Sequence, residues 1–327
     1  MPSEEPPIID FSPFYGSDDS KKAALVEKIR EACERFGFFQ LINHEVPSTL
    51  QQQVIKQSKE LFELPLEIKE KYGKDVGGYN RGYECLRSQN FEKKGKGDLK
   101  EGFYMGKNLP LDDQYVIEKR FGQGPNKYPA ELRDPKEFQR VMERYHEMMT
   151  ALAVNLLQVL ACTLNLNTNF FDDFCEHPVA ALRLLHYPPQ DPAATEVEKG
   201  IGAHTDFGAI TILLQDQTGG LQVWNNLSSE WVDVTPIPGA YVVNLGNMMM
   251  RWTNDRYFVP FFFSGNPNYT VECLPSCVDP QMGGKYPPVM VHDWMSGRFA
   301  DTYGSSKDEA FGDLRQDVVA GIDANRV

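Results

Sequence analysis

The chain has 327 residues, of which 41% are hydrophobic and 24% are charged, so it can bury a sizeable core as one or two domains. Its formal net charge of −13 argues against a nucleic acid or an anionic membrane as a partner, because both need a basic surface. No apolar run approaches the roughly 20 residues of a membrane-spanning helix, and the six cysteines follow no disulfide or zinc pattern. We therefore expect a cytoplasmic protein.

The first part of the chain predicts an α/β region with long loops. Ile8–Phe11 and Phe38–Ile42 are short apolar runs typical of buried strands. Apolar spacing predicts one helix over about 21–35 and a second helix after Pro47. Residues 73–130 have little periodicity, so we expect long loops and short strands there, and loops of this length are often functional.

The second half predicts one long helix and then many short strands. Apolar residues recur at three- and four-residue steps from Phe138 to Leu166, which is typical of a long support helix that faces the core. From Ala180 onward, short apolar runs alternate with Pro and Gly turns. The expected strands are Leu182–Tyr187, Ala209–Leu214, Leu221–Trp224, Trp231–Val234, Ala240–Leu245 and Phe258–Phe263. This spacing predicts a sandwich or an open barrel.

The His204-Thr205-Asp206 motif carries the chemistry. In a strand, residues two apart point to the same face, so the His204 imidazole and the Asp206 carboxylate could converge on one metal ion. One carboxylate and two imidazoles form the facial triad of non-haem Fe(II) oxygenases, which leaves coordination positions open. The motif alone is weak evidence, because a surface turn would explain most occurrences of so short a pattern.

Further motifs surround this pair in a fixed order. They are Pro7-Ile-Ile-Asp-Phe11, Gly37-Phe-Phe-Gln-Leu-Ile-Asn-His44, Leu185-His-Tyr-Pro-Pro189, Gly202-Ala-His-Thr-Asp-Phe-Gly208, Gly219-Gly-Leu-Gln-Val223, Val243-Asn-Leu-Gly-Asn247, Arg251-Trp-Thr-Asn-Asp255 and Pro260-Phe-Phe-Phe263. Together they resemble the isopenicillin N synthase-like branch of the 2-oxoglutarate/Fe(II)-dependent dioxygenase superfamily over nearly the whole chain. One departure is Glu45, where the family usually has Gly.

The resemblance implies an α+β or mainly β fold. Its core would be a double-stranded β-helix (jelly roll) with flanking helices and an N-terminal α/β region. The expected parts are an N-terminal dioxygenase region at 1–130, a support-helix region at 131–179, an Fe(II)/2-oxoglutarate jelly-roll domain at 180–290 and a C-terminal helical tail at 291–327.

The resemblance also implies roles for individual residues. His204 and Asp206 would be catalytic iron ligands, and Tyr187 matches a position that hydrogen-bonds 2-oxoglutarate. Arg256 is the best candidate for holding the far carboxylate of 2-oxoglutarate, because a guanidinium pairs two N–H donors with a carboxylate. Arg256 could equally be a loop residue without that role.

The third iron ligand is missing from the sequence. Family members carry this His in a segment of about fifteen residues that is absent here between Tyr257 and Phe258. The sequence could omit a stretch of a normal enzyme, the chain could be a deletion that binds iron poorly, or it could use another ligand, with His292 as a weak candidate. Physical reasoning favours omission, because deleting a core strand exposes unpaired backbone groups of its neighbours.

On this resemblance we expect a dioxygenase that uses Fe(II), 2-oxoglutarate and O₂ to oxidise a C–H bond of a small organic molecule. The reaction would be a hydroxylation, a desaturation or a cyclisation, with release of succinate and CO₂. Phe207, Leu221 and Phe263 could line the substrate pocket, although each also suits the core. The alternatives are a 2-oxoglutarate-independent oxidase of the same fold and a metal-poor pseudoenzyme that binds a small ligand. No nucleic-acid or membrane partner is expected, and a monomer is the default.

Overall fold

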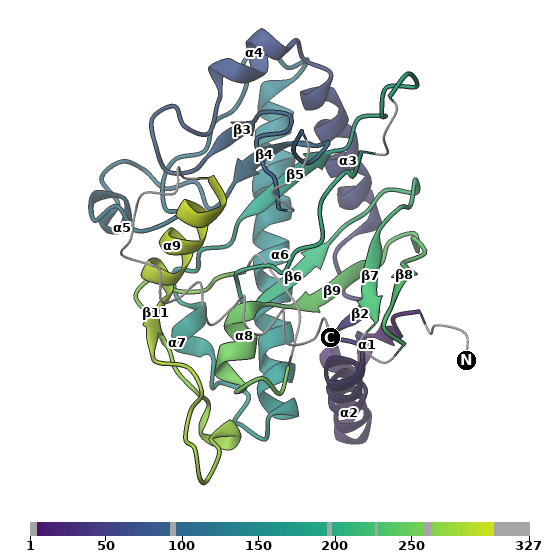
Figure 1. The fold of residues 1–327 in the computed structure, drawn as a ribbon, viewed down its shortest axis with the longest axis vertical. Helices are drawn as coiled ribbons and strands as arrows, with labels where there is room; N and C mark the ends of the chain where they lie inside the picture. Colours follow the sequence, from purple (N-terminus) through teal and green to yellow (C-terminus); the bar gives the residue numbers. More distant parts are fainter. Residues whose placement is uncertain (1–4, 92–95, 195–197, 226–227, 258–262, 304–327) are drawn as a thin grey trace.

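The protein folds around the long helix α6 (Pro135–Thr163), which runs through the middle of Figure 1. The computed structural model describes residues 5–91, 96–194, 198–225, 228–257 and 263–303. The other helices are α1 (Ser12–Tyr15), α2 (Asp19–Arg35), α3 (Ser48–Phe62), α4 (Leu66–Lys71), α5 (Gln114–Ile117), α7 (Asp172–Cys175), α8 (Asn247–Trp252) and α9 (Val291–Tyr303), with a 3-10 turn at Pro275–Cys277. The strands are β1 (Ile8–Asp10), β2 (Phe38–Ile42), β3 (Gly82–Glu84), β4 (Glu101–Met105), β5 (Leu182–His186), β6 (Ile210–Leu213), β7 (Gln222–Asn225), β8 (Glu230–Asp233), β9 (Tyr241–Leu245), β10 (Thr270–Val271) and β11 (Val289–Met290).

Helix α6 confirms the predicted support helix. Asp134 caps it by accepting a hydrogen bond from the backbone N–H of Glu137 at 3.0 Å, so the helix begins at Pro135 rather than at Phe138. Its apolar face is buried, and α2 and α3 pack against it. The helix therefore forms the spine of the core, as its periodicity predicts.

The N-terminal strands join the second half of the chain in one sheet. β1 pairs with β2 in parallel, and β2 pairs antiparallel with β9, so the strand order is β1-β2-β9-β6. β9 is buried along its whole length, which explains why its sequence is almost continuously apolar rather than alternating. The region at 1–130 and the region at 180–290 thus share a core.

The jelly roll predicted from the sequence is present only in part. The other described strands form small sheets of order β3-β4-β5, β7-β8 and β10-β11, and the described residues form no closed barrel. The strand expected at 258–263 lies outside the described residues except for Phe263, which bridges Ala180 and Ile210. A barrel closes only when every strand has a partner on both edges, and the described sheets have strands with a free edge.

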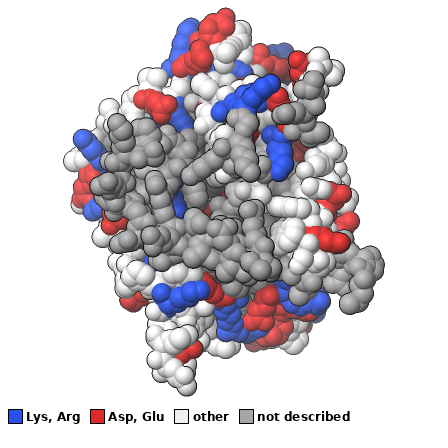
Figure 2. All heavy atoms as spheres, viewed as in Figure 1, with Lys and Arg blue, Asp and Glu red and all other residues white. Residues whose placement is uncertain are grey.

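The surface carries both signs of charge. On the face shown in Figure 2, the blue Lys and Arg side chains and the red Asp and Glu side chains are interspersed. Within the described ranges, no helix is both long enough and apolar enough to cross a lipid bilayer.

Candidate functional site

His204 and Asp206 lie in the loop that leads into β6, and not in a strand. The expectation that strand geometry aligns them is therefore wrong. The loop nevertheless brings the two side chains together, with 3.3 Å between His204 Nε2 and Asp206 Oδ1. Asp206 is buried and His204 is about one-fifth exposed, so the pair lies at the edge of the core.

The imidazole of His204 is oriented by its neighbours. Its Nδ1 lies 2.8 Å from the carbonyl oxygen of Gly202, so Nδ1 carries the proton and donates. The ring of Phe91 stacks on the imidazole at a centroid distance of 4.5 Å. Nε2 is the ring nitrogen that faces Asp206, and in the neutral tautomer with the proton on Nδ1 it carries the lone pair, which is how metal-binding histidines are usually held.

The carboxylate of Asp206 is held from the other side. The hydroxyl of Thr211 donates to Asp206 Oδ2 at 2.8 Å, which leaves Oδ1 toward His204. The backbone carbonyl of Asp206 accepts from the N–H of Asn247 at 3.3 Å, at the start of α8. A ligand carboxylate that is itself hydrogen-bonded in this way keeps its orientation when a cation binds.

This pair fits two neighbouring positions around a divalent ion. Two ligand atoms that lie about 2.1 Å from an octahedral ion at right angles to each other are about 3.0 Å apart. The observed 3.3 Å needs only a small adjustment. No set of three His, Cys, Asp or Glu side chains in the described ranges could hold a metal ion, so a third protein ligand is not found among them.

Tyr187 follows β5 and lies near the pair. Desolvation raises the pKa of its hydroxyl, Arg183 opposes this effect, and the negative charges of Asp98 and Asp206 add to it. The residue as a whole is 46% exposed, although its hydroxyl is desolvated. The charge of Asp206 is thus close enough to act on the Tyr187 hydroxyl, and the role of Tyr187 in binding 2-oxoglutarate stays a prediction.

Arg256 is placed elsewhere, and its predicted role requires correction. Its guanidinium donates to Glu34 Oε1 on α2 at 2.9 Å and 3.2 Å, and the ion pair is more than one-third exposed. The physical reason is the turn after α8, which is closed by the backbone hydrogen bond from Arg256 to Thr253 at 3.0 Å and places the guanidinium beside Glu34 of α2. The alternative interpretation of Arg256 as a loop residue is the one that the structure supports.

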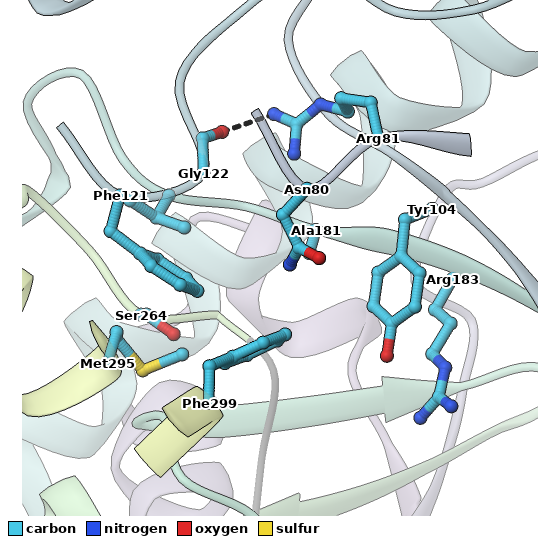
Figure 3. Close-up of a pocket in the computed structure, with 11 residues that line it drawn as sticks. Asn80, Arg81, Tyr104, Phe121, Gly122, Ala181, Arg183, Ser264, Met295 and Phe299 are labelled. Atoms are coloured by element: carbon cyan, nitrogen blue, oxygen red, sulfur yellow. Dashed lines mark hydrogen bonds between the residues drawn. The ribbon is translucent and has the colours of Figure 1, made fainter. Parts of the chain in front are cut away.

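The three residues suggested for a substrate pocket are packed differently from one another. Phe263 is buried in the main core, with its ring 6.0 Å from that of Phe174. Phe207 is partly buried against the same core, and Leu221 packs beside the small Val223 cluster under β7 and β8. None of the three is among the residues that line the cavity shown in Figure 3, and their role in a substrate pocket stays a prediction.

The remaining histidines of interest make structural contacts. His186 Nδ1 lies 2.8 Å from Glu101 Oε1, and His44 Nε2 lies 2.8 Å from the carbonyl of Gly239. His292 Nδ1 accepts from the backbone N–H of Phe121 at 3.0 Å, which occupies one of the two ring nitrogens that could bind a metal. The structure gives His292 no contact with Asp206 among the described residues.

Sequence reasoning missed a buried cation beside the site. Lys100 Nζ pairs with Asp98 at 3.0 Å and lies 5.3 Å from the centroid of the Phe91 ring, which in turn covers His204. Asp98 also accepts from the backbone N–H of Gly202 at 3.0 Å. Burial, with a contribution from a neighbouring arginine, lowers the pKa of Lys100 to about 8. The signal in the sequence is the charged run Asp98-Leu-Lys-Glu101, which leads into the buried strand β4.

An imidazole and a carboxylate aimed at one position beside small β-sheets are typical of non-haem Fe(II) oxygenases. The model of the non-haem dioxygenase N-terminal region, described from morphine synthesis, matches residues 6–131, and the 2OG-Fe(II) oxygenase superfamily model matches residues 178–261. The chain belongs to the 2OG-Fe(II) oxygenase superfamily. This family uses Fe(II) and 2-oxoglutarate with O₂.

Known relatives extend over nearly all of the chain. The 2-oxoglutarate-Fe(II) type oxidoreductase hxnY of Emericella nidulans is 45% identical over 94% of this chain and 93% of its own length. The 2-oxoglutarate-dependent dioxygenase citB of Monascus ruber is 41% identical over 82% of this chain and 87% of its own length. The crystal structure of a full-length Neurospora crassa protein in complex with alpha-KG and thymine is 27% identical, has a TM-score of 0.77, and covers 90% of this chain and 96% of that one.

Proposed function

We propose that this chain is an Fe(II)- and 2-oxoglutarate-dependent dioxygenase that oxidises a C–H bond of a small organic molecule, with release of succinate and CO₂. The observation that carries the proposal is the 3.3 Å pairing of His204 Nε2 with Asp206 Oδ1 in a chain of this family. Crystal structures of the Neurospora crassa neighbour contain alpha-KG with thymine or 5-formyluracil, which supports a small organic substrate for this chain as well.

Each residue of the site would have a separate task. His204 and Asp206 would hold the iron, which supplies the activation of O₂ when it is bound. The carbonyl of Gly202 accepts from Nδ1, so in the neutral imidazole the lone pair that can bind a metal is on Nε2. Thr211 occupies the second oxygen of Asp206, and the Phe91 ring covers one side of the imidazole. Tyr187 would donate its hydroxyl to 2-oxoglutarate.

The chain as written would hold this iron weakly. Two protein ligands leave more positions to water than the three of a facial triad, and water replaces a strong imidazole donor. The family segment that is absent between Tyr257 and Phe258 is where that imidazole is expected. We therefore propose that the active form of the enzyme contains this segment, and that the 327-residue chain provides only two of the three iron ligands.

Metal titration tests the proposal. Calorimetric titration of the full chain with Mn²⁺ or Fe(II) under anaerobic conditions should show one weak site, which His204→Ala and Asp206→Ala each abolish. His292→Ala is the matched control, because its ring bonds only to the backbone of Phe121 in the described contacts. Binding that survives both site substitutions, or that His292→Ala removes, would contradict the proposal.

Restoring the segment separates the candidate functions. A chain with the family segment inserted between Tyr257 and Phe258 should bind the metal more tightly and should form succinate from 2-oxoglutarate. Substrate oxidation without succinate would instead indicate an oxidase of the same fold. A restored chain that still binds no metal would indicate a protein that only binds a small ligand.

A further inference from the structure

The buried ion pair of Asp98 and Lys100 is linked to the candidate metal ligand His204 by two separate routes. Lys100 Nζ lies 3.0 Å from Asp98 Oδ2, and the Lys100 and Asp98 side chains are only 1% and 5% exposed. A buried ion pair usually adds little net stability, because the desolvation of both charges offsets their attraction. Stability alone therefore does not account for this pair, and its contacts indicate what else it does.

The first route runs from Asp98 through Gly202. Asp98 Oδ1 accepts from the backbone N–H of Gly202 at 3.0 Å, while Oδ2 accepts from the ammonium of Lys100. The carbonyl oxygen of Gly202 lies 2.8 Å from His204 Nδ1. One carboxylate thus fixes the residue whose carbonyl accepts from the imidazole, and a carbonyl in that position sets the tautomer and the orientation of a metal-binding histidine.

The second route runs from Lys100 through Phe91. The ammonium lies 5.3 Å from the centroid of the Phe91 ring, and that ring stacks on the His204 imidazole at 4.5 Å with 11° between the two planes. A cation is attracted to the face of an aromatic ring, so Lys100 favours this position of Phe91. The torsion that turns an imidazole about its Cβ–Cγ bond has broad minima, so the stacked ring restricts a rotation that would otherwise be easy.

The chain around the ion pair is also attached to the loop that leads to His204. The backbone N–H of Leu99 donates to the carbonyl of Lys199 at 2.9 Å, and Arg87 forms an ion pair with Glu198. The two charged residues therefore lie at a junction between the N-terminal region and this loop. Neither of them can move away from His204 without breaking further contacts.

We propose that Asp98 and Lys100 are positioning residues for His204. Asp98 acts through Gly202 on the proton of Nδ1, and Lys100 acts through Phe91 on the plane of the ring. Together they keep Nε2 aimed at the position beside Asp206 before a metal binds. The proposal rests on the proposed function only in calling Nε2 a metal ligand, because the tautomer of His204 is a property of the metal-free chain.

The first measurement is the tautomer of His204 in the metal-free 327-residue chain. Nitrogen NMR shifts of the imidazoles, followed to the pH at which His204 is neutral, distinguish a proton on Nδ1 from a proton on Nε2. The chain has only six histidines, so the signal of His204 can be assigned by its loss in His204→Ala. We expect the proton mainly on Nδ1 in the wild type and a mixture of both tautomers in Asp98→Ala and in Lys100→Met.

The second measurement is the affinity for Mn²⁺, followed by the broadening of NMR signals, which detects weak binding. Removing a residue that orients a metal ligand typically costs about 10- to 100-fold in metal affinity, so we expect at least a tenfold loss in Asp98→Ala and in Lys100→Met. Lys69→Met is the matched control. It breaks another buried ion pair, that of Lys69 with Glu101 at 2.7 Å, and the other partners of Glu101 are Tyr83 and His186. This control should be less stable to urea but should keep the wild-type tautomer and Mn²⁺ affinity.

The outcomes separate a positioning role from a structural one. Mixed tautomers in Asp98→Ala and Lys100→Met, with the wild-type tautomer retained in Lys69→Met, support the proposal. Unchanged tautomers in Asp98→Ala and Lys100→Met, an equal change in Lys69→Met, or a wild-type His204 that carries its proton on Nε2 would overturn it.

A milder pair of variants keeps the test decisive if the buried substitutions fail to fold by circular dichroism. Phe91 is only partly buried, so Phe91→Leu and Phe91→Tyr should both fold. Phe91→Leu removes the stacked ring and should give mixed tautomers, whereas Phe91→Tyr keeps the ring and should behave as the wild type. Wild-type tautomers in both variants would count against the proposal. A wild-type chain that binds no Mn²⁺ would contradict the proposed function and would leave these tautomer comparisons valid.

Discussion

The buried ion pair between Lys69 and Glu101 holds the start of β4 beside the site, and its removal has a predictable cost. Lys69 Nζ lies 2.7 Å from Glu101 Oε2, and the two side chains are only 8% and 9% exposed. Tyr83 donates to the same oxygen at 2.6 Å, and His186 Nδ1 lies 2.8 Å from the other oxygen. Lys69→Met keeps the length of the side chain but leaves the carboxylate buried without its cation.

Breaking a buried pair from one side typically costs about 3–5 kcal/mol, because the remaining charge stays desolvated. Two donors remain for Glu101 after the substitution, so we expect a loss near the lower end, at about 3 kcal/mol of unfolding free energy. The double variant Lys69→Met with Glu101→Leu removes both charges and should be less destabilised than Lys69→Met alone. Urea unfolding followed by circular dichroism measures both.

An exposed pair provides the control for this experiment. Arg140 pairs with Glu137 at 2.7 Å on the surface of α6, so Arg140→Met should leave the urea midpoint nearly unchanged. Lys69→Met within about 1 kcal/mol of the wild type would refute the reasoning, since the carboxylate would then behave as if it were solvated. A double variant at least as unstable as Lys69→Met would refute it as well.

Three further outcomes follow from the structure. Burial raises the pKa of Glu101, but hydrogen bonds led by the one from Lys69 outweigh burial and lower the pKa below 4.5. The contribution of the ionised Glu101 to stability is therefore complete above about pH 4.5 and is lost as the pH falls below it. Urea midpoints from pH 3 to pH 7 should show that loss, and Lys69→Met should make it smaller. Gly265→Ala should destabilise the fold strongly, because the φ of Gly265 is +67° and a Cβ at this position would overlap the Phe174 ring. Equal thermal unfolding midpoints of the variant and the wild type would contradict this contact. Burial also raises the pKa of the Cys33 thiol, so a thiol reagent at about pH 8 should label the exposed Cys85 first and Cys33 only on unfolding, as timed mass spectrometry would show.

The elements that sequence reasoning predicts well are those with a strong local signal. The predicted strand at Phe38–Ile42 is confirmed by β2. A short apolar run between the end of a helix and a turn is too short for another helix, so it favours a buried strand. The end of α6 is harder to predict, since the helix stops at Thr163 although apolar residues continue to Leu166. There the chain turns at Asn165, whose φ is +59°, and nothing in the apolar spacing marks that turn.

The parts that could not be predicted depend on contacts between distant segments. Arg81 and Lys100 both lie in the aperiodic segment at 73–130, where the expected state of a charged side chain is exposed. Their burial depends on contacts that the local sequence does not show: Gly122 accepts from Arg81 across 41 positions, and Asp98, the partner of Lys100, accepts from the backbone N–H of Gly202. A single sequence contains no local pattern for such an arrangement, although a long aperiodic segment is itself a sign of function.

The position of the His204–Asp206 pair does not depend on the segment that family members carry between Tyr257 and Phe258. Contacts from Gly202, Thr211 and Asn247 hold the pair, and all three lie outside that segment. The chain after the gap also returns to the same sheet, because Phe263 exchanges backbone hydrogen bonds with Ala209 and Ile210 at 2.9 Å and 3.1 Å. A restored segment would therefore supply its imidazole to two ligands that are already in place. Its expected effect is on how tightly the metal is held, while the arrangement of the first two ligands stays the same.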